Sequence, residues 1–319
     1  MFKHFFILLL ICSFLNADLV NLYRTQGIDA VKTQLEEVLK NKAYWKDFLQ
    51  NKDTQFGYYE SKQYVIITEK ETKKLKLYKN ENNKFEKLLD DKVIVGEKEG
   101  DKKVEGDKKT PIGAYNLTSK ITKLDSFYGP LALVTSYPNS FDKSLKKNGH
   151  GIWIHGMPLD SDREEYTKGC IALDNPQLEQ LDKSINFDKS VLLISQNDIQ
   201  SVSKDELSLI FSFIFNWKDA WKKSDIDTYL SYYSQDFRKS NGANINDFKK
   251  YKKRIFSKKE DKTIKFSNIN IMPYPNSINK KMYKIEMDQL YRTKRYKFEG
   301  KKELYIEVKN DKVSILSEG

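Results

Sequence analysis

Three chemically versatile side chains lie close together in one stretch of this sequence. His150 and His155 flank a short apolar run, and Cys170 follows after a polar loop. A cysteine attacks as a thiolate, and a nearby imidazole can take its proton. We therefore interpret Cys170 as a candidate nucleophile and His155 as its base. The alternatives are an inert buried thiol and a histidine that only packs in the core.

The residues around the cysteine favour the same chemistry. Gly169 allows a tight turn beside the sulfur, and we expect the amides of Gly169 and Cys170 to be free to hold an oxyanion. His150 precedes His155 by an odd number of residues, which predicts the opposite face of a continuous strand. One Cys and two His at this spacing match no zinc pattern, so we expect neither a metal nor a cofactor.

The elements that must position these residues follow from changes in the pattern along the chain. We expect a helical region and then a strand-rich region that contains one helix, which begins at Asp174 or Asn175. A polar linker and an α+β region follow. The expected bounds are 18–57, 58–196, 197–204 and 205–319. The first region is too small to bury its own core. It must pack on a neighbouring domain or on another subunit, for example in a homodimer formed through its helices.

The first 17 residues predict export. Lys3 and His4 precede an apolar run over 5–15, and Ala17 offers a small residue for cleavage, as in a secretory signal peptide. An uncleaved anchor is the alternative. Cleavage leaves Cys170 as the one cysteine, which excludes an intramolecular disulfide. No later apolar run reaches about 18 residues, so we expect no membrane span after cleavage and a periplasmic location.

Composition limits the classes of protein further. The chain has 319 residues, 39% of them hydrophobic, which predicts more than one domain with buried cores. The formal net charge is +11, with the lysines spread along the chain. With export, this charge favours an anionic partner in the cell envelope over a nucleic acid.

Two ordered motifs resemble those of the YkuD-type L,D-transpeptidases. The first is His155-Gly156 followed, after a gap, by Thr167-Lys168-Gly169-Cys170. The second lies at 106–115 and contains Thr110-Pro111-Ile112-Gly113-Ala114-Tyr115, similar to the Thr-Pro-x-Gly-x-Tyr/Phe element of the family. The resemblance covers about residues 60–195. It implies a β-rich, sandwich-like catalytic fold that acts on the peptide stems of peptidoglycan.

The resemblance also assigns roles to individual residues. It makes Cys170 the nucleophile and His155 the base, with the carbonyl of Gly156 orienting the imidazole. The family commonly has Arg two residues after the Cys, where this chain has Ala172. Further candidates for substrate contact, each with a purely structural alternative, are Lys168, Thr167, His150, Tyr137 and Trp153.

The whole chain is similar to the cell-shape L,D-carboxypeptidases of helical Gram-negative bacteria. Those proteins join a helical N-terminal region, this catalytic domain and a nuclear-transport-factor-2-like domain, which here would span 205–319. The resemblance predicts removal of the terminal D-Ala from the meso-diaminopimelate of tetrapeptide stems through a cysteine thioester. The alternatives are an L,D-transpeptidase, which forms 3-3 cross-links or attaches proteins to peptidoglycan, and a noncatalytic peptidoglycan-binding module.

Overall fold

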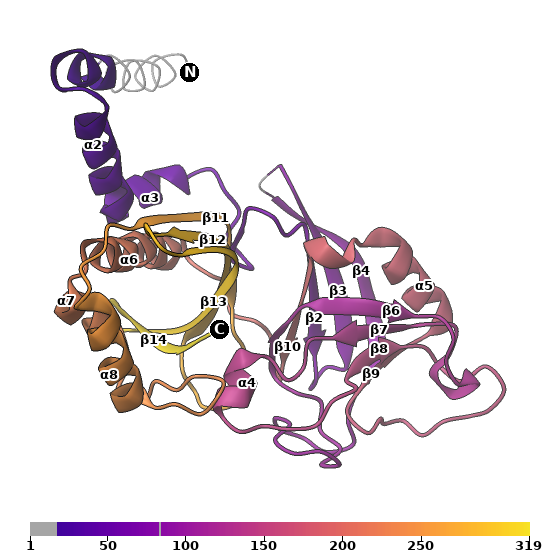
Figure 1. Ribbon diagram of the computed structural model, residues 1–319. Coiled ribbons are helices and arrows are strands. Elements are labelled where there is room, and N and C mark those ends of the chain that lie inside the picture. Colours follow the sequence, from indigo (N-terminus) through magenta and orange to yellow (C-terminus); the bar gives the residue numbers. More distant parts are fainter. Residues whose placement is uncertain (1–17, 83) are drawn as a thin grey trace, which may run out of the picture.

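The computed structural model describes residues 18–82 and 84–319. The expected signal peptide, 1–17, lies outside the described residues. Within them, helices at the N-terminal end lead into a β-sandwich, and a curved sheet with three helices follows (Figure 1). In the described part of the chain no helix is both long and apolar enough to cross a membrane.

The N-terminal helices pack on the C-terminal half of the molecule. Residues 18–26 are helical, followed by α2 (Ile28–Lys40) and α3 (Lys42–Phe48). The side chain of Asn41 caps α3 by accepting a hydrogen bond from the amide of Ala43. Trp45 on α3 is buried and stacks on Phe211, with ring centroids 4.1 Å apart. By contrast α2 buries no residue, and with the helix before it extends away from the body (Figure 1).

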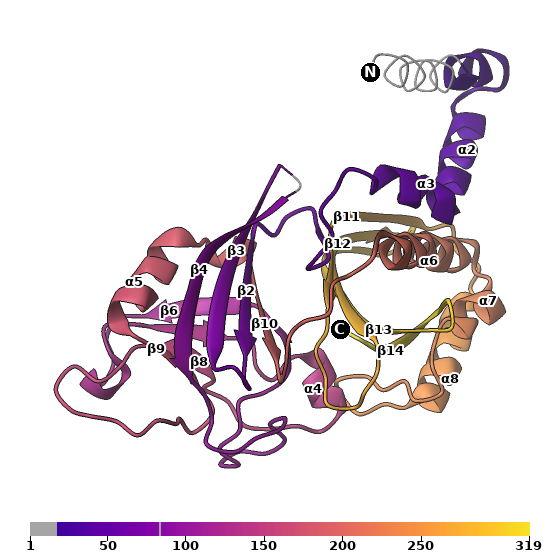
Figure 2. The same ribbon diagram turned by 180° about the vertical axis from the view of Figure 1, so that it is seen from behind.

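The sandwich consists of two layers that share one continuous hydrogen-bonded strand order. That order is β5-β10-β2-β3-β4-β9-β8-β7-β6. Figure 2 shows β2, β3 and β4 in front of β6, β8 and β9. The strands are β2 (Tyr64–Glu69), β3 (Lys74–Glu81), β4 (Lys84–Ile94), β5 (Gly113–Tyr115), β6 (Leu117–Ile121), β7 (Ala132–Thr135), β8 (Trp153–His155), β9 (Ile171–Leu173) and β10 (Ser190–Ser195).

Alternating apolar side chains fill the space between the two layers. Leu75 and Leu77 of β3 face inward and belong to one buried cluster with Leu133 and Ile154 from the opposite layer. Their spacing of two residues is what a strand with one buried face requires. The fold class expected from the sequence, a mostly-β sandwich, is confirmed.

Short helices close the ends of the sandwich. They are η1 (Ser126–Tyr128), α4 (Ser140–Ser144), α5 (Asn175–Ser184) and η2 (Phe187–Lys189). Asp174 precedes α5 and Pro176 occupies its first turn, where a missing N–H costs nothing. Leu178 and Leu181 bury the inner face of α5 against the sandwich.

The C-terminal half packs three helices against an antiparallel sheet of order β1-β11-β12-β13-β14. A capping box between Ser203 and Glu206 starts α6, which has 20 residues. Strand β13 pairs with β12 along the whole length of β12, from Arg292↔Lys297 to Met282↔Glu307. The elements are β1 (Tyr58–Tyr59), α6 (Lys204–Lys223), α7 (Ile226–Ser231), α8 (Ile245–Phe256), β11 (Thr263–Pro273), β12 (Met282–Arg292), β13 (Lys297–Lys309) and β14 (Lys312–Glu318).

The two halves are joined by both backbone pairing and a shared core. Strand β1, expected to open the sandwich, instead pairs with β11 of the C-terminal sheet. Phe141 of α4 stacks on Tyr305 of β13 and meets Tyr274 edge-on. Asn116 donates a 2.7 Å hydrogen bond to the buried carboxylate of Glu286. The sandwich therefore packs directly against the C-terminal sheet.

Candidate active site

His155 ends strand β8 and is almost fully buried, with 1% of its surface exposed. Its Nδ1 lies 2.7 Å from the carbonyl oxygen of Gly156, so the proton of the neutral ring belongs on Nδ1. The ring of Tyr128 meets the imidazole edge-on, with centroids 5.1 Å apart. This arrangement leaves the Nε2 lone pair as the basic position of the side chain.

Burial sets the protonation state of this imidazole. It lowers the pKa of His155 from 6.5 to about 4, the hydrogen bond to Gly156 opposes the shift, and the charge of Arg163 adds to it. The ring is therefore neutral at pH 7 and able to accept a proton.

Cys170 precedes a strand that is adjacent to the strand of His155, because β8 and β9 pair in parallel. Ile154 pairs with Ile171 and His155 with Ala172, so Cys170 enters the sheet next to Trp153, two residues before His155. Side chains two residues apart on a strand share a face. Sγ of the half-buried Cys170 lies 3.4 Å from the carbonyl oxygen of Gly151, to which the thiol donates.

The thiol is also neutral in the resting site. Burial raises the pKa of Cys170, while the backbone amide of Trp153 and the charges of Arg163 and Lys102 act in the opposite direction. A pair made of a neutral thiol and a neutral imidazole needs a proton transfer before attack. The thiolate is then formed at the moment of reaction.

Two threonines fix the backbone of the cysteine. The Thr167 hydroxyl donates to the carbonyl of Cys170 at 2.7 Å, and that of Thr110 donates to the same carbonyl at 3.5 Å. Thr110 Oγ1 in turn accepts from the amide of Gly96 at 2.8 Å. The upstream Thr-Pro motif, 60 residues from Cys170 in sequence, thus braces the carbonyl of the candidate nucleophile.

Gly169 takes a conformation that other residues rarely adopt. Its φ is 133°, and an added Cβ would lie 2.8 Å from the carbonyl oxygen of Lys109. Its amide donates to Thr167 Oγ1 at 3.0 Å. The expectation that this amide is free for an oxyanion is therefore wrong for this conformation, since the Thr167 turn already uses it. The amide of Cys170 is the donor that we retain in the mechanism below.

Two residues expected to contact substrate, Thr167 and Tyr137, form hydrogen bonds within the protein instead. Thr167 is 3% exposed and its hydroxyl binds backbone on both sides. Tyr137 is 5% exposed, packs in the sandwich core and donates to the carbonyl of Asn148. In this structure neither hydroxyl is available to a substrate, because each is hydrogen-bonded inside the protein.

The other three candidates remain accessible to different degrees. His150 is exposed and its Nε2 lies 3.8 Å from a carboxylate oxygen of Glu105. Lys168 is exposed next to the Gly-Cys turn. Trp153 is half-buried, with its ring edge-on to Tyr128 at 5.4 Å. A role in substrate contact stays a prediction for all three.

Three further residues shape the site, and sequence reasoning missed them. Asn175 accepts from the amide of Met157 at 2.8 Å and donates to its carbonyl at 3.2 Å, which clamps the chain just after Gly156. Tyr128 covers the imidazole, and Arg163 lies in the loop before Cys170. Only the cap position of Asn175 offered a sequence signal, and it pointed to the helix rather than to the site.

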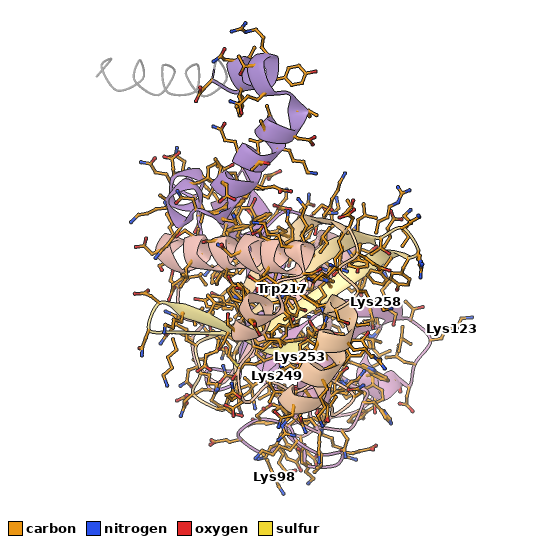
Figure 3. The ribbon with its side chains drawn as sticks, turned by 60° about the vertical axis from the view of Figure 1, so that its left-hand side comes forward. Lys98, Lys123, Trp217, Lys249, Lys253 and Lys258 are labelled. Atoms are coloured by element: carbon orange, nitrogen blue, oxygen red, sulfur yellow. The ribbon has the colours of Figure 1, made fainter. Side chains whose placement is uncertain are left out.

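Positive charge is spread over both halves of the surface. Lys253 on α8 and Lys258 just beyond it are exposed, as are Lys98 and Lys123 in loops of the sandwich (Figure 3). Within 18–82 and 84–319, no three His, Cys, Asp or Glu side chains form a group that could hold a metal ion.

Comparison with known families agrees with this fold and site. Residues 63–191 match the family described as YkuD, the L,D-transpeptidase catalytic domain. Residues 209–319 match the Cds6 C-terminal NTF2-like domain. No curated protein matches the chain.

Solved structures extend the similarity over nearly the whole chain. The helical cell shape determining protein Pgp2 from Campylobacter jejuni is 41% identical, with a TM-score of 0.83, over 88% of this chain and 100% of Pgp2. Bd1075 of Bdellovibrio bacteriovorus is 27% identical, with a TM-score of 0.65, over 84% of this chain and 96% of that one.

The chain therefore belongs to the YkuD family, in the branch that carries a C-terminal NTF2-like domain. The resemblance drawn from the two sequence motifs is confirmed. This family assignment makes the protein a cysteine-dependent enzyme of the L,D-transpeptidase type.

Proposed function

We propose that this protein is a periplasmic peptidoglycan L,D-carboxypeptidase that removes D-Ala from tetrapeptide stems and influences cell shape. The observation that supports the proposal is the parallel pairing of β8 with β9, which places Cys170 at the start of the strand adjacent to that of a neutral His155, whose Nδ1 is held by Gly156. Similarity to Pgp2, a helical cell shape determining protein, supports the link to shape and to the cell wall.

Acylation begins with a proton transfer. Nε2 of His155 takes the thiol proton of Cys170, and the sulfur attacks the diaminopimelate carbonyl that is joined to D-Ala. The amide of Cys170 donates to the resulting oxyanion, an interaction worth roughly 3 kcal/mol in comparable sites. The imidazolium then gives its proton to the nitrogen of the departing D-Ala, and a thioester on Cys170 remains.

Water completes the cycle. His155, neutral again, accepts a proton from a water molecule as that water attacks the thioester. The tripeptide stem leaves with a free carboxylate, and the proton returns to the sulfur. An amine of a second stem in place of water would give a cross-link, so the acceptor alone separates a carboxypeptidase from a transpeptidase.

The test is turnover of purified tetrapeptide muropeptides by residues 18–319. We expect free D-Ala and tripeptide muropeptides as the products. Cys170→Ala should abolish release, and His155→Ala should lower kcat by roughly 10²–10⁴-fold. Lys123→Gln, which removes an exposed charge, serves as the matched control and should behave as wild type.

Two results would overturn the proposal in different ways. Full D-Ala release by Cys170→Ala or His155→Ala would show that these residues are not the nucleophile and its base. Dimers with 3-3 cross-links as the main product would make the protein a transpeptidase.

A further inference from the structure

The loop between β8 and β9 contains an arginine with unsatisfied donors. The half-buried Arg163 donates from Nη2 to the carbonyl of Tyr166 at 3.2 Å. Its Nε and Nη1 are shielded from solvent and have no hydrogen-bond partner among the described residues. Leaving the donors of a charged group unpaired is costly, so an acceptor that is not part of the fold would stabilise this guanidinium.

A chain of aromatic contacts links this guanidinium to the proposed base, His155. The Arg163 guanidinium carbon lies 5.1 Å from the ring centroid of Phe127. Phe127 meets Tyr128 edge-on at 5.4 Å, and Tyr128 meets His155 edge-on at 5.1 Å. Arg163 is thus placed on the His155 side of the site, where the leaving group must also lie to receive its proton.

The charge of Arg163 affects the pKa values of both His155 and Cys170. Besides burial, which has the largest effect, it contributes to the lowered pKa of His155 and opposes the raised pKa of Cys170. The interaction with Cys170 is mutual, since it also acts on Arg163. These directions agree with the aromatic contacts in placing the guanidinium on the same side of the site as the imidazole.

Other cations near the cysteine are less suited to bind an anion. Lys102 is buried and already paired with Asp107 at 2.8 Å. Ala172, at the position where the family commonly has Arg, is fully buried in β9 and offers no charge. Of the two cations whose charge acts on the thiol, Arg163 and Lys102, only Arg163 therefore has buried unpaired donors for a negatively charged substrate group.

We propose that Arg163 is a specificity-determining residue that binds the terminal α-carboxylate of the residue released from the stem peptide. The inference rests on the proposed function, because both concern the bond to a terminal D-amino acid. In the bound state Nη1 and Nε donate charge-assisted hydrogen bonds to the carboxylate, and Phe127 supports the guanidinium from its face. The enzyme then requires a free C-terminus and rejects stems that continue beyond it.

The experiment compares two substrates with three forms of the enzyme. A tetrapeptide stem that ends in D-Ala and the same peptide ending in D-Ala amide are given to wild type, Arg163→Gln and Arg163→Lys. Wild type should prefer the carboxylate by roughly 10- to 100-fold in kcat/KM, the range expected for hydrogen bonds between charged groups. Arg163→Gln should lose that preference by slowing only on the carboxylate substrate, and Arg163→Lys should recover part of it.

Controls separate binding from structure. Lys123→Gln removes a positive charge from an exposed loop of the same domain and should keep the wild-type preference. An equal loss on both substrates in Arg163→Gln would show a merely structural role and overturn the assignment. A third peptide carries the amide on the free carboxyl group of diaminopimelate instead of on D-Ala. It tests whether Arg163 binds that diaminopimelate carboxylate. If Arg163→Gln abolishes discrimination against that peptide alone, the terminal carboxylate is the wrong partner.

Failure of this inference can be told from failure of the proposed function. Normal D-Ala release by wild type with an unchanged substrate preference in Arg163→Gln refutes only the role of Arg163. A wild type that neither releases D-Ala nor forms a thioester on Cys170, measured by mass spectrometry, refutes both. A wild type that forms cross-links refutes hydrolysis, and the same comparison of acylation rates then decides the role of Arg163.

Discussion

His155 is the residue whose surroundings most directly set the pH dependence of the enzyme. Its neutral form is required, and burial lowers its pKa to about 4. Activity should therefore fall on the acid side with a midpoint near 4 rather than near 6.5, because protonation there removes the base. On the alkaline side, activity should persist beyond the ordinary thiol range, since burial raises the pKa of Cys170. Measuring kcat/KM against pH checks both limbs.

Tyr128→Ala provides the comparison for this profile. Removing the ring that covers His155 admits water, which weakens the largest cause of the shift. The acid limb should move upward toward 6.5. A wild-type limb already at 6.5 would contradict the buried, neutral imidazole.

Gly156 is a second residue with a sharp expectation. A Cβ at this position would lie 2.2 Å from Asn175 Oδ1 and 3.0 Å from Cδ of Pro130, so Gly156→Ala must displace the clamp behind the imidazole. A shift of about 1 Å in a positioned group can cost 10²-fold in rate, and we expect a loss of roughly that size in kcat. Ser161→Ala, an exposed change in the same loop, should leave kcat unaltered. Wild-type kcat in Gly156→Ala would show that the clamp does not position the base.

At the scale of elements, the sequence predicted individual strands and helices better than it predicted which strands pair. The apolar run that became β8 and the Pro-led helix α5 are visible in sequence because each depends on residues that are close together in the chain. The parallel pairing of β8 with β9, which places Cys170 next to the strand of His155, depends on contacts distant in sequence. The same holds for the hydroxyl of Thr110 at the Cys170 carbonyl. The wrong expectation for the Gly169 amide arose because a motif gives residue types and not hydrogen-bond partners.

The turn before β9 is the element on which the nucleophile depends. Thr167→Val keeps the shape of the side chain but removes both hydroxyl bonds, leaving the amide of Gly169 without its acceptor. We expect a loss of about 1–3 kcal/mol in the free energy of unfolding, together with slower acylation of Cys170. Urea denaturation measures the first quantity, and mass spectrometry of the thioester measures the second.

Thr118→Val is the matched control for this turn. Thr118 lies on β6, away from Cys170, and its exposed hydroxyl donates to the carbonyl of Val134 on β7 at 3.3 Å. This variant should change the free energy of unfolding little and leave acylation of Cys170 unchanged. Equal behaviour of the two variants would show that the Thr167 turn does not hold the cysteine in place.

For the whole molecule, the shared core predicts that the catalytic and C-terminal halves unfold together. Phe141 is 4% exposed and packs between Tyr274 and Tyr305, and the strand β1 adds backbone bonds across the same boundary. Phe141→Ala should lower the free energy of unfolding by about 3–5 kcal/mol, as for other buried aromatic residues. Loss of activity and loss of near-ultraviolet circular dichroism should then keep a common urea midpoint, shifted to lower concentration.

Phe298→Ala, at 37% exposure on β13, is the control and should shift the urea midpoint of neither signal appreciably. Two separate transitions in the wild type would mean that the halves fold independently, and the NTF2-like domain would then not support the catalytic site through this interface.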